Sequence, residues 1–178
     1  GKQMKPDFKN KVVLITGASS GFGEDAAMLF AQEGCKVVLA ARRMDRLQNL
    51  AERIQSAGGE AIAIPVDIVN VADVDNMVQT TLDLYGHIDI LFNNAGIGRV
   101  EWFENHTLER DLDTLVHVNL TSLMQVTRSV LHDMLALGVG AYSRRPAERL
   151  WANTWGWRPP ARARAFALIP IIRLTGDV

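Results

Sequence analysis

The 178 residues are 48% hydrophobic and 22% charged with a net charge of −1, a composition typical of one globular domain. No apolar run reaches the roughly eighteen residues that a membrane span needs, and the polar segment 1–10 does not resemble a secretion signal. Cys35 is the single cysteine, which excludes an intramolecular disulfide and offers no zinc pattern. We therefore expect a cytoplasmic protein with no membrane partner and no metal.

Short apolar runs alternate with amphipathic stretches as far as about residue 136. This rhythm predicts a parallel sheet with helices on both faces, a doubly wound α/β fold. Glycine follows each of the first three predicted helices, as is typical of helix C-termini. In chain order we expect strands over 11–16, 36–41, 61–66 and 88–92, and helices over 22–33, 44–57, 71–85 and 111–137.

The strongest motif is the run Thr-Gly-Ala-Ser-Ser-Gly-Phe-Gly at residues 16–23, between the first strand and the first helix. Glycines there allow a tight turn, close approach of the backbone to a pyrophosphate, and close packing of helix on strand. The helix N-terminus then offers free N–H groups to phosphate. The predicted cofactor-binding residues of this turn are Gly17, Ser19, Ser20, Gly21, Phe22 and Gly23.

A second motif discriminates between the two nicotinamide dinucleotides. An acidic residue about twenty positions beyond the glycines would bind the ribose 2′-hydroxyl of NAD. Arg42 and Arg43 stand at that point instead, and no acidic residue lies between Glu33 and Asp45. Guanidinium groups suit a 2′-phosphate, so we predict NADP(H) in preference to NAD(H). In the alternative interpretation, the two arginines only solvate the start of a helix.

Two further motifs follow the third and fourth strands. Asp67 and Ile68 come after the third strand, and the loop Asn93-Asn94-Ala95-Gly96 comes after the fourth. The carboxyl ends of parallel strands meet at one edge of the sheet, where ligands bind in open α/β folds. Alone, each loop would be an ordinary turn, but together with the glycine turn they predict one binding site.

In these motifs and in Val118-Asn119-Leu120, residues 9 to about 136 resemble the classical short-chain dehydrogenase/reductase family, in its N-terminal portion. The resemblance implies a Rossmann-type sheet, truncated here after the fourth strand and the long helix. It also implies an oxidoreductase that interconverts an alcohol and a carbonyl by hydride transfer. By the same resemblance, Asp67 faces the adenine, Asn94, Ala95 and Gly96 pass beside the cofactor ribose, and Asn119 belongs to the catalytic tetrad.

The family's chemistry also needs a serine and a Tyr-x-x-x-Lys motif. The lysine stabilises the phenolate of a tyrosine whose pKa would otherwise lie near 10, and it holds the nicotinamide ribose. Tyr85 and Tyr142 are the only tyrosines, four residues before Asp89 and Pro146, and no lysine follows Lys36. We therefore expect catalysis to be impaired in this chain.

The composition changes abruptly near residue 137. Residues 138–178 hold seven Arg, no Lys, one Glu and one Asp, together with three of the four Trp and four of the six Pro. We interpret 1–136 as an incomplete NADP-binding domain and 137–178 as a poorly ordered tail. A reading-frame change or a divergent C-terminus would explain the tail, and the abruptness favours the first. Arginines among tryptophans could contact nucleic acid by charge and stacking, but accidental composition is the simpler explanation, so we expect no nucleic-acid partner.

Three functional hypotheses remain open. The first is a family oxidoreductase with crippled catalysis, the second a non-catalytic nucleotide-binding or interaction module, and the third a non-functional truncated product. Relatives in the family form homo-oligomers, which is doubtful here because the sheet is incomplete. The resemblance implies a small-molecule alcohol or carbonyl compound as the substrate of the intact family.

Overall fold

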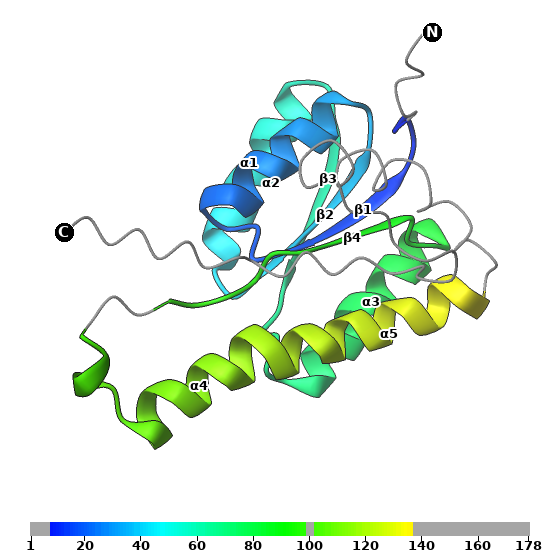
Figure 1. The fold of residues 1–178 in the computed structure, drawn as a ribbon. Helices are drawn as coiled ribbons and strands as arrows, with labels where there is room; N and C mark the ends of the chain where they lie inside the picture. The colour runs from blue at the N-terminus through cyan, green and yellow to red at the C-terminus, as the bar shows by residue number, and fades with distance from the viewer. Residues whose placement is uncertain (1–7, 99–101, 137–178) are drawn as a thin grey trace, which may run out of the picture.

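The computed structural model describes residues 8–98 and 102–136, which form one four-stranded parallel sheet with helices on both faces (Figure 1). The strands lie in the order β3-β2-β1-β4. From β1 the chain adds β2 and β3 on one side and then crosses over to add β4 on the other side of β1. Doubly wound sheets bind their ligands in the crevice at such a crossover. The bounds of the strands are β1 Val12–Thr16, β2 Lys36–Ala41, β3 Glu60–Pro65 and β4 Ile90–Asn93.

Helices α1 and α2 cover one face of the sheet, and α3 and α5 cover the other (Figure 1). A short 3₁₀ turn, η1, precedes a long helix that contains two π-helical segments, η2 and η3. The bounds are α1 Gly21–Gln32, α2 Met44–Ser56, α3 Val71–Tyr85, η1 Phe103–Asn105, η2 Leu108–Leu112, α4 Asp113–Val116, η3 His117–Ser122 and α5 Leu123–Ala136. The predicted fold class is confirmed, and the predicted tail, 137–178, lies outside the described residues.

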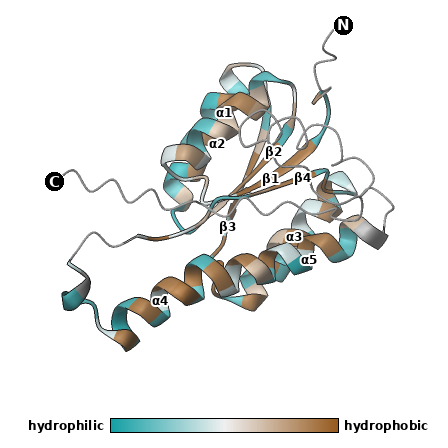
Figure 2. Cartoon of the chain, viewed as in Figure 1, coloured by the Kyte–Doolittle hydropathy of each residue, from teal (hydrophilic) through white to brown (hydrophobic). Residues whose placement is uncertain are grey.

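Alternate residues of the central strands enter two separate cores. Val13 and Ile15 of β1 pack toward α1 and α2, whereas Val12 and Leu14 pack toward α3 and α5. Both faces of β1 are therefore buried, which explains why its sequence is a continuous apolar run with no polar alternation. Figure 2 shows the same pattern, with hydrophobic colouring concentrated in the strands between the two helical layers.

The fourth strand begins two residues later than its apolar run predicts. Asp89 directs a carboxylate oxygen at the backbone N–H of Val12, 2.8 Å away, and its own N–H donates to the Val12 carbonyl. The Asp89 side chain thus takes the place of the first backbone hydrogen bond between β1 and β4. Regular pairing of these strands starts at Ile90 and continues to Asn93. In the described part of the chain, β4 is an edge strand.

The long helix begins at Leu108, three residues before its predicted start. Thr107 caps it, since its hydroxyl accepts from the Arg110 N–H while the Asp111 carboxylate accepts from the Thr107 N–H, 2.9 Å away. The two bonds form a reciprocal cap that satisfies donors at the helix N-terminus. None of the helices within 8–98 and 102–136 is long and apolar enough to cross a membrane.

Candidate functional site

Gly17 in the turn after β1 and Gly23 in the first turn of α1 allow the turn, the helix and the loop that follows β4 to pack closely together. Gly17 has a φ of +67°, and a Cβ added there would lie 2.8 Å from the Ala95 Cα. A Cβ on Gly23 would lie 2.3 Å from the Gly17 carbonyl oxygen. A side chain at either position would push these segments apart, so the tight turn and the close packing that the motif predicts are present in the structure.

The start of α1 has backbone donors that no side chain caps. Ser20 occupies the N-cap in an extended conformation, but its hydroxyl makes no capping bond to the helix. The first N–H groups of a helix have no partner within the helix, and together with the helix dipole they favour an anion. The turn thus presents donors and a positive field at the carboxyl edge of the sheet.

The Thr16 hydroxyl joins the glycine turn to the loop after β4. It accepts from the N–H groups of Asn94 and Ala95, each 3.1 Å away, and donates to the Asn93 side-chain oxygen, also 3.1 Å away. A hydroxyl can donate one hydrogen bond and accept two, so the Thr16 hydroxyl makes every hydrogen bond of which it is capable. Sequence reasoning missed this role, and the one available signal was a polar residue at the end of a buried apolar run.

Asn93 extends the same network into the long helix. Its amide nitrogen donates to the Leu123 carbonyl at 3.1 Å and to the Thr127 hydroxyl at 3.0 Å. Both Thr16 and Asn93 are buried, at 0% and 1% exposure, where an unmade hydrogen bond is expensive. The sheet edge, the turn and α5 are therefore held in one arrangement.

The two arginines after β2 differ in their surroundings. Arg43 donates to the Ser19 hydroxyl at 2.9 Å and to the Ser20 hydroxyl at 2.8 Å, so its guanidinium lies against the glycine turn. Arg42 is exposed and makes no hydrogen bond or ion pair within residues 8–98 and 102–136. All five N–H donors of Arg42 are therefore available to a ligand.

Asp67 shapes the loop after β3. Its carboxylate accepts from the Val69 N–H at 3.3 Å, while its own N–H donates to the Asp73 carboxylate at 2.9 Å. The adjacent Ile68 is buried and joins the core that α3 covers. These bonds fix the loop whose side chains face the cleft.

Asn119 lies on η3 and binds the loop after β4 through both atoms of its amide. Its oxygen accepts from the Ile97 N–H and its nitrogen donates to the Ile97 carbonyl, each at 2.8 Å. The π-helical turn, where π-bulges often mark functional sites, contains this residue. Asn119 is thus in the cleft, with its amide bonded to one peptide unit.

These segments surround a cleft of about 870 Å³ at the carboxyl edge of the sheet, a size usual for small-molecule sites. Gly21 and Gly23 are not among the residues that line it. Every other residue predicted for the site lines it. These are Gly17, Ser19, Ser20, Phe22, Arg42, Arg43, Asp67, Ile68, Asn94, Ala95, Gly96 and Asn119.

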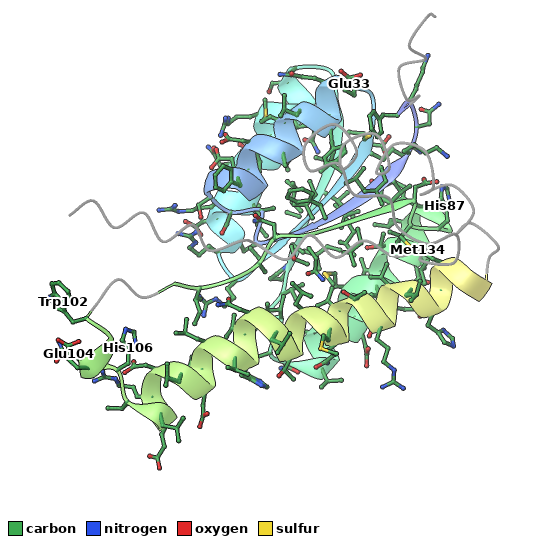
Figure 3. All side chains as sticks on the ribbon, in the orientation of Figure 1. Glu33, His87, Trp102, Glu104, His106 and Met134 are labelled. Atoms are coloured by element: carbon green, nitrogen blue, oxygen red, sulfur yellow. The ribbon has the colours of Figure 1, made fainter. Side chains whose placement is uncertain are left out.

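Tyr85, the tyrosine within the described residues, does not line this cleft. Tyr85 ends α3, and its pKa is raised to about 12, first by burial and then by the Glu60 carboxylate. Figure 3 shows His87, two residues later, at the opposite end of the molecule from Trp102 and His106, which lie near the start of the long helix. Tyr142 lies outside the described residues.

The fold and the cleft define an α/β protein of the doubly wound class, with a crevice at the switch point of its sheet. The family model described as short chain dehydrogenase matches residues 11–141, and the chain belongs to this family. The resemblance stated from the motifs is therefore confirmed.

Relatives and solved structures agree with this assignment. The chain is 42% identical over 118 residues to 11-beta-hydroxysteroid dehydrogenase-like 2 of Arabidopsis thaliana, covering 66% of this chain and 38% of the relative. A short-chain type dehydrogenase/reductase from Mycobacterium marinum superposes with a TM-score of 0.71 at 33% identity, over 74% of this chain and 53% of that one. L-sorbose reductase from Gluconobacter frateurii, solved with NADPH and L-sorbose, gives 0.68 at 32% identity, over 75% and 51%. The chain thus spans about half the length of the solved relatives, and less of the plant one.

Proposed function

We propose that this chain binds NADP(H) in the cleft at the carboxyl edge of its sheet. The observation that carries the proposal is Arg42, an exposed guanidinium with no hydrogen-bond partner among the described residues, which lines the same cleft as the glycine turn. A 2′-phosphate placed there would gain charge-assisted bonds, whereas the plain ribose of NAD would gain none. The NADPH-bound L-sorbose reductase, similar in fold, supports the same choice.

The proposed roles combine the positions of the residues in the cleft with what the family resemblance implies. The pyrophosphate would lie at the N-terminus of α1, held by the turn that contains Gly17, Gly21 and Gly23. Asp67 and Ile68 would border the adenine, and Asn94 to Gly96 would pass beside the dinucleotide. When bound, the cofactor supplies hydride transfer, and the residues of this chain position it.

We further propose that the chain descends from an alcohol–carbonyl oxidoreductase and that its own turnover is impaired. Asn119 is the only residue of the family's catalytic tetrad that the sequence contains, and its amide is engaged with Ile97. The sequence contains no Tyr-x-x-x-Lys motif, so it offers no tyrosine whose pKa a lysine lowers for the proton transfer that the family uses. A non-catalytic nucleotide-binding module is the second candidate function, favoured by the same observation.

A thermal-unfolding scan with and without excess NADPH tests the proposal. A ligand that binds only the folded state stabilises it by about 2.7 kcal/mol when its concentration is one hundred times Kd. We expect a rise in Tm with NADPH that exceeds the rise with NADH. Arg42→Ala should remove this difference, whereas Arg128→Ala, an exposed substitution on α5, should preserve it.

The outcomes separate the candidates. Binding followed by steady oxidation of NADPH with carbonyl substrates would contradict the impaired turnover. Binding without turnover would favour the non-catalytic module, and a folded chain whose Tm does not respond to NADPH would refute the binding site. No cooperative transition at all would favour a non-functional product.

A further inference from the structure

We propose that the segment 165–169, Ala-Phe-Ala-Leu-Ile, pairs with β4 of the same chain and adds a fifth strand to the sheet. The segment lies outside the described residues. It would then be an ordered part of the predicted tail, 137–178. The inference concerns the edge of the sheet and does not depend on what binds in the cleft.

The two edges of the described sheet differ in how well they resist pairing (Figure 1). At one edge, β3 begins with an exposed glutamate, Glu60, and ends with an exposed proline, Pro65. Charged residues and prolines on an edge strand hinder the addition of another strand. At the other edge, β4 has the sequence Ile-Leu-Phe-Asn, with no charged residue and no proline. The edge at β4 is therefore suited to a further strand.

The side chains of β4 are less buried than those of the strand beside it. All five residues of β1 are buried, whereas Ile90, Leu91 and Phe92 of β4 are only partly buried. Ile90 and Phe92 pack toward the core under α1 and α2, and Leu91 packs toward the core under α3 and α5. A strand added beside β4 would extend both cores, so it should be apolar on both of its faces.

The segment 165–169 meets this requirement. It opens the longest run in 137–178 that is free of glycine, polar and charged residues, and Arg164 precedes it. Its five residues are close in number to the four of β4. Proline is tolerated on edge strands but not within central ones, so Pro170 ends the strand and marks it as the new edge.

The connection to β4 is short in space and long in sequence. Helix α5, which ends at Ala136, lies beside β4, because the Asn93 side chain donates to the Leu123 carbonyl at 3.1 Å. Residues 137–164 then lead to the segment. A crossover between parallel strands needs about a dozen residues, and an antiparallel connection needs fewer. The connection is thus long enough for either direction of pairing.

A second copy of the chain is the competing occupant of this edge. A segment tethered to the same molecule has an effective concentration on the order of millimolar, provided that its linker spans the distance. At micromolar protein concentrations, the tethered segment therefore has the advantage over the β4 edge of another copy.

Hydrogen exchange of the whole 178-residue chain, measured at single amides by NMR, tests the inference. In a strand at an open edge, the N–H groups that point away from the sheet are exposed to solvent. We expect these groups in β4 to exchange at least about tenfold more slowly than free amides.

Two variants identify the segment responsible. Leu168→Pro removes an N–H from the segment, and Leu168→Asp places a charge in it; each should speed the exchange of the outward β4 amides by about tenfold. Ala152→Pro, elsewhere in 137–178, is the matched control and should leave these amides unchanged. The amides between β1 and β2 should keep their rates in all three variants, which shows that the sheet remains folded.

Three results would overturn the inference. Outward β4 amides that exchange as fast as free amides would mean that the edge is open. Protection that persists in both Leu168 variants would mean that another segment covers it. Protection that grows with protein concentration, together with a dimer mass in light scattering, would assign the edge to a second copy. None of these results affects the NADPH-dependent rise in Tm, so the proposed function is tested separately.

Discussion

The side-chain amide of Asn119 pairs with the peptide unit of Ile97 through two hydrogen bonds of 2.8 Å. This pair is a direct polar link between the π-helical turn of the long helix and the loop that leaves β4. The same side chain that the family resemblance assigns to catalysis therefore also fixes the wall of the cleft.

Replacing Asn119 by Ala should destabilise the protein by about 1–3 kcal/mol, because the Ile97 N–H and carbonyl both lose their partner. Urea unfolding followed by circular dichroism measures the change. Asn76→Ala, an exposed substitution on α3, is the control and should alter the free energy of unfolding by less than about 0.5 kcal/mol. Equal effects of the two variants would contradict the structural role of Asn119.

Loss of the Thr16 hydroxyl should weaken the fold and the cleft together. Thr16→Val keeps the branched shape but leaves the N–H groups of Asn94 and Ala95 without an acceptor, and we expect a loss of about 1–3 kcal/mol. Thr16→Ser keeps the hydroxyl and should recover most of that loss. Chemical denaturation of the two variants checks this, and a valine variant as stable as the serine variant would refute the network.

Gly23→Ala should be strongly unfavourable. The added Cβ would lie 2.3 Å from the Gly17 carbonyl oxygen and 2.6 Å from the Asn94 amide nitrogen, so the turn or the loop must move. Overpacking of this kind costs about 1–3 kcal/mol. Gly98→Ala is the matched control, since a Cβ there meets no atom within 4 Å. Thermal unfolding measures both variants. An equal fall in Tm for Gly23→Ala and Gly98→Ala would contradict the close packing around Gly23.

Stability should fall in alkali through Cys35. Burial first, then the nearby carboxylates of Asp89 and Glu33, raise the pKa of its thiol from 9.0 to about 11. The folded state therefore favours the protonated form, and this contribution is complete below pH 9 and lost as the pH rises toward about 11. The free energy of unfolding should decline over that window and decline less in Cys35→Ala. If the free energy of unfolding fell equally with pH in the two proteins, Cys35 would be excluded as a cause of the loss of stability.

Exposed apolar side chains recur every four residues along the long helix, at Val116, Leu120 and Met124, which are 55%, 49% and 61% exposed. Such a stripe favours self-association. Leu120→Glu combined with Met124→Glu should raise the protein concentration up to which the sample remains monodisperse, as measured by light scattering. Leu84→Glu, on α3, removes an isolated exposed leucine and should have a smaller effect.

The sequence alone determined the order and type of the main helices and strands, and it predicted the edge of the sheet where the cleft lies. Apolar periodicity and glycine positions are local signals, so β2 and α3 have the bounds that the pattern predicts. The start of β4 and the start of the long helix were predicted wrongly by two to three residues. Asp89 replaces a backbone rung in the first case, and Thr107 caps the helix early in the second.

Only the tertiary structure decided how the candidate site is held together. Thr16 and Asn93 are 77 residues apart, and no local pattern links their side chains. The same holds for the two arginines, which are equivalent in the sequence until the fold brings Ser19 and Ser20 against Arg43 and gives Arg42 no hydrogen-bond partner within the described residues. Periodicity reports which face of an element is buried, whereas hydrogen-bond partners depend on which loops the sheet brings together. The sequence therefore predicted the edge of the sheet at which the cleft lies, and the packing at that edge decided which polar groups in the cleft remain without a hydrogen bond in the described part of the chain.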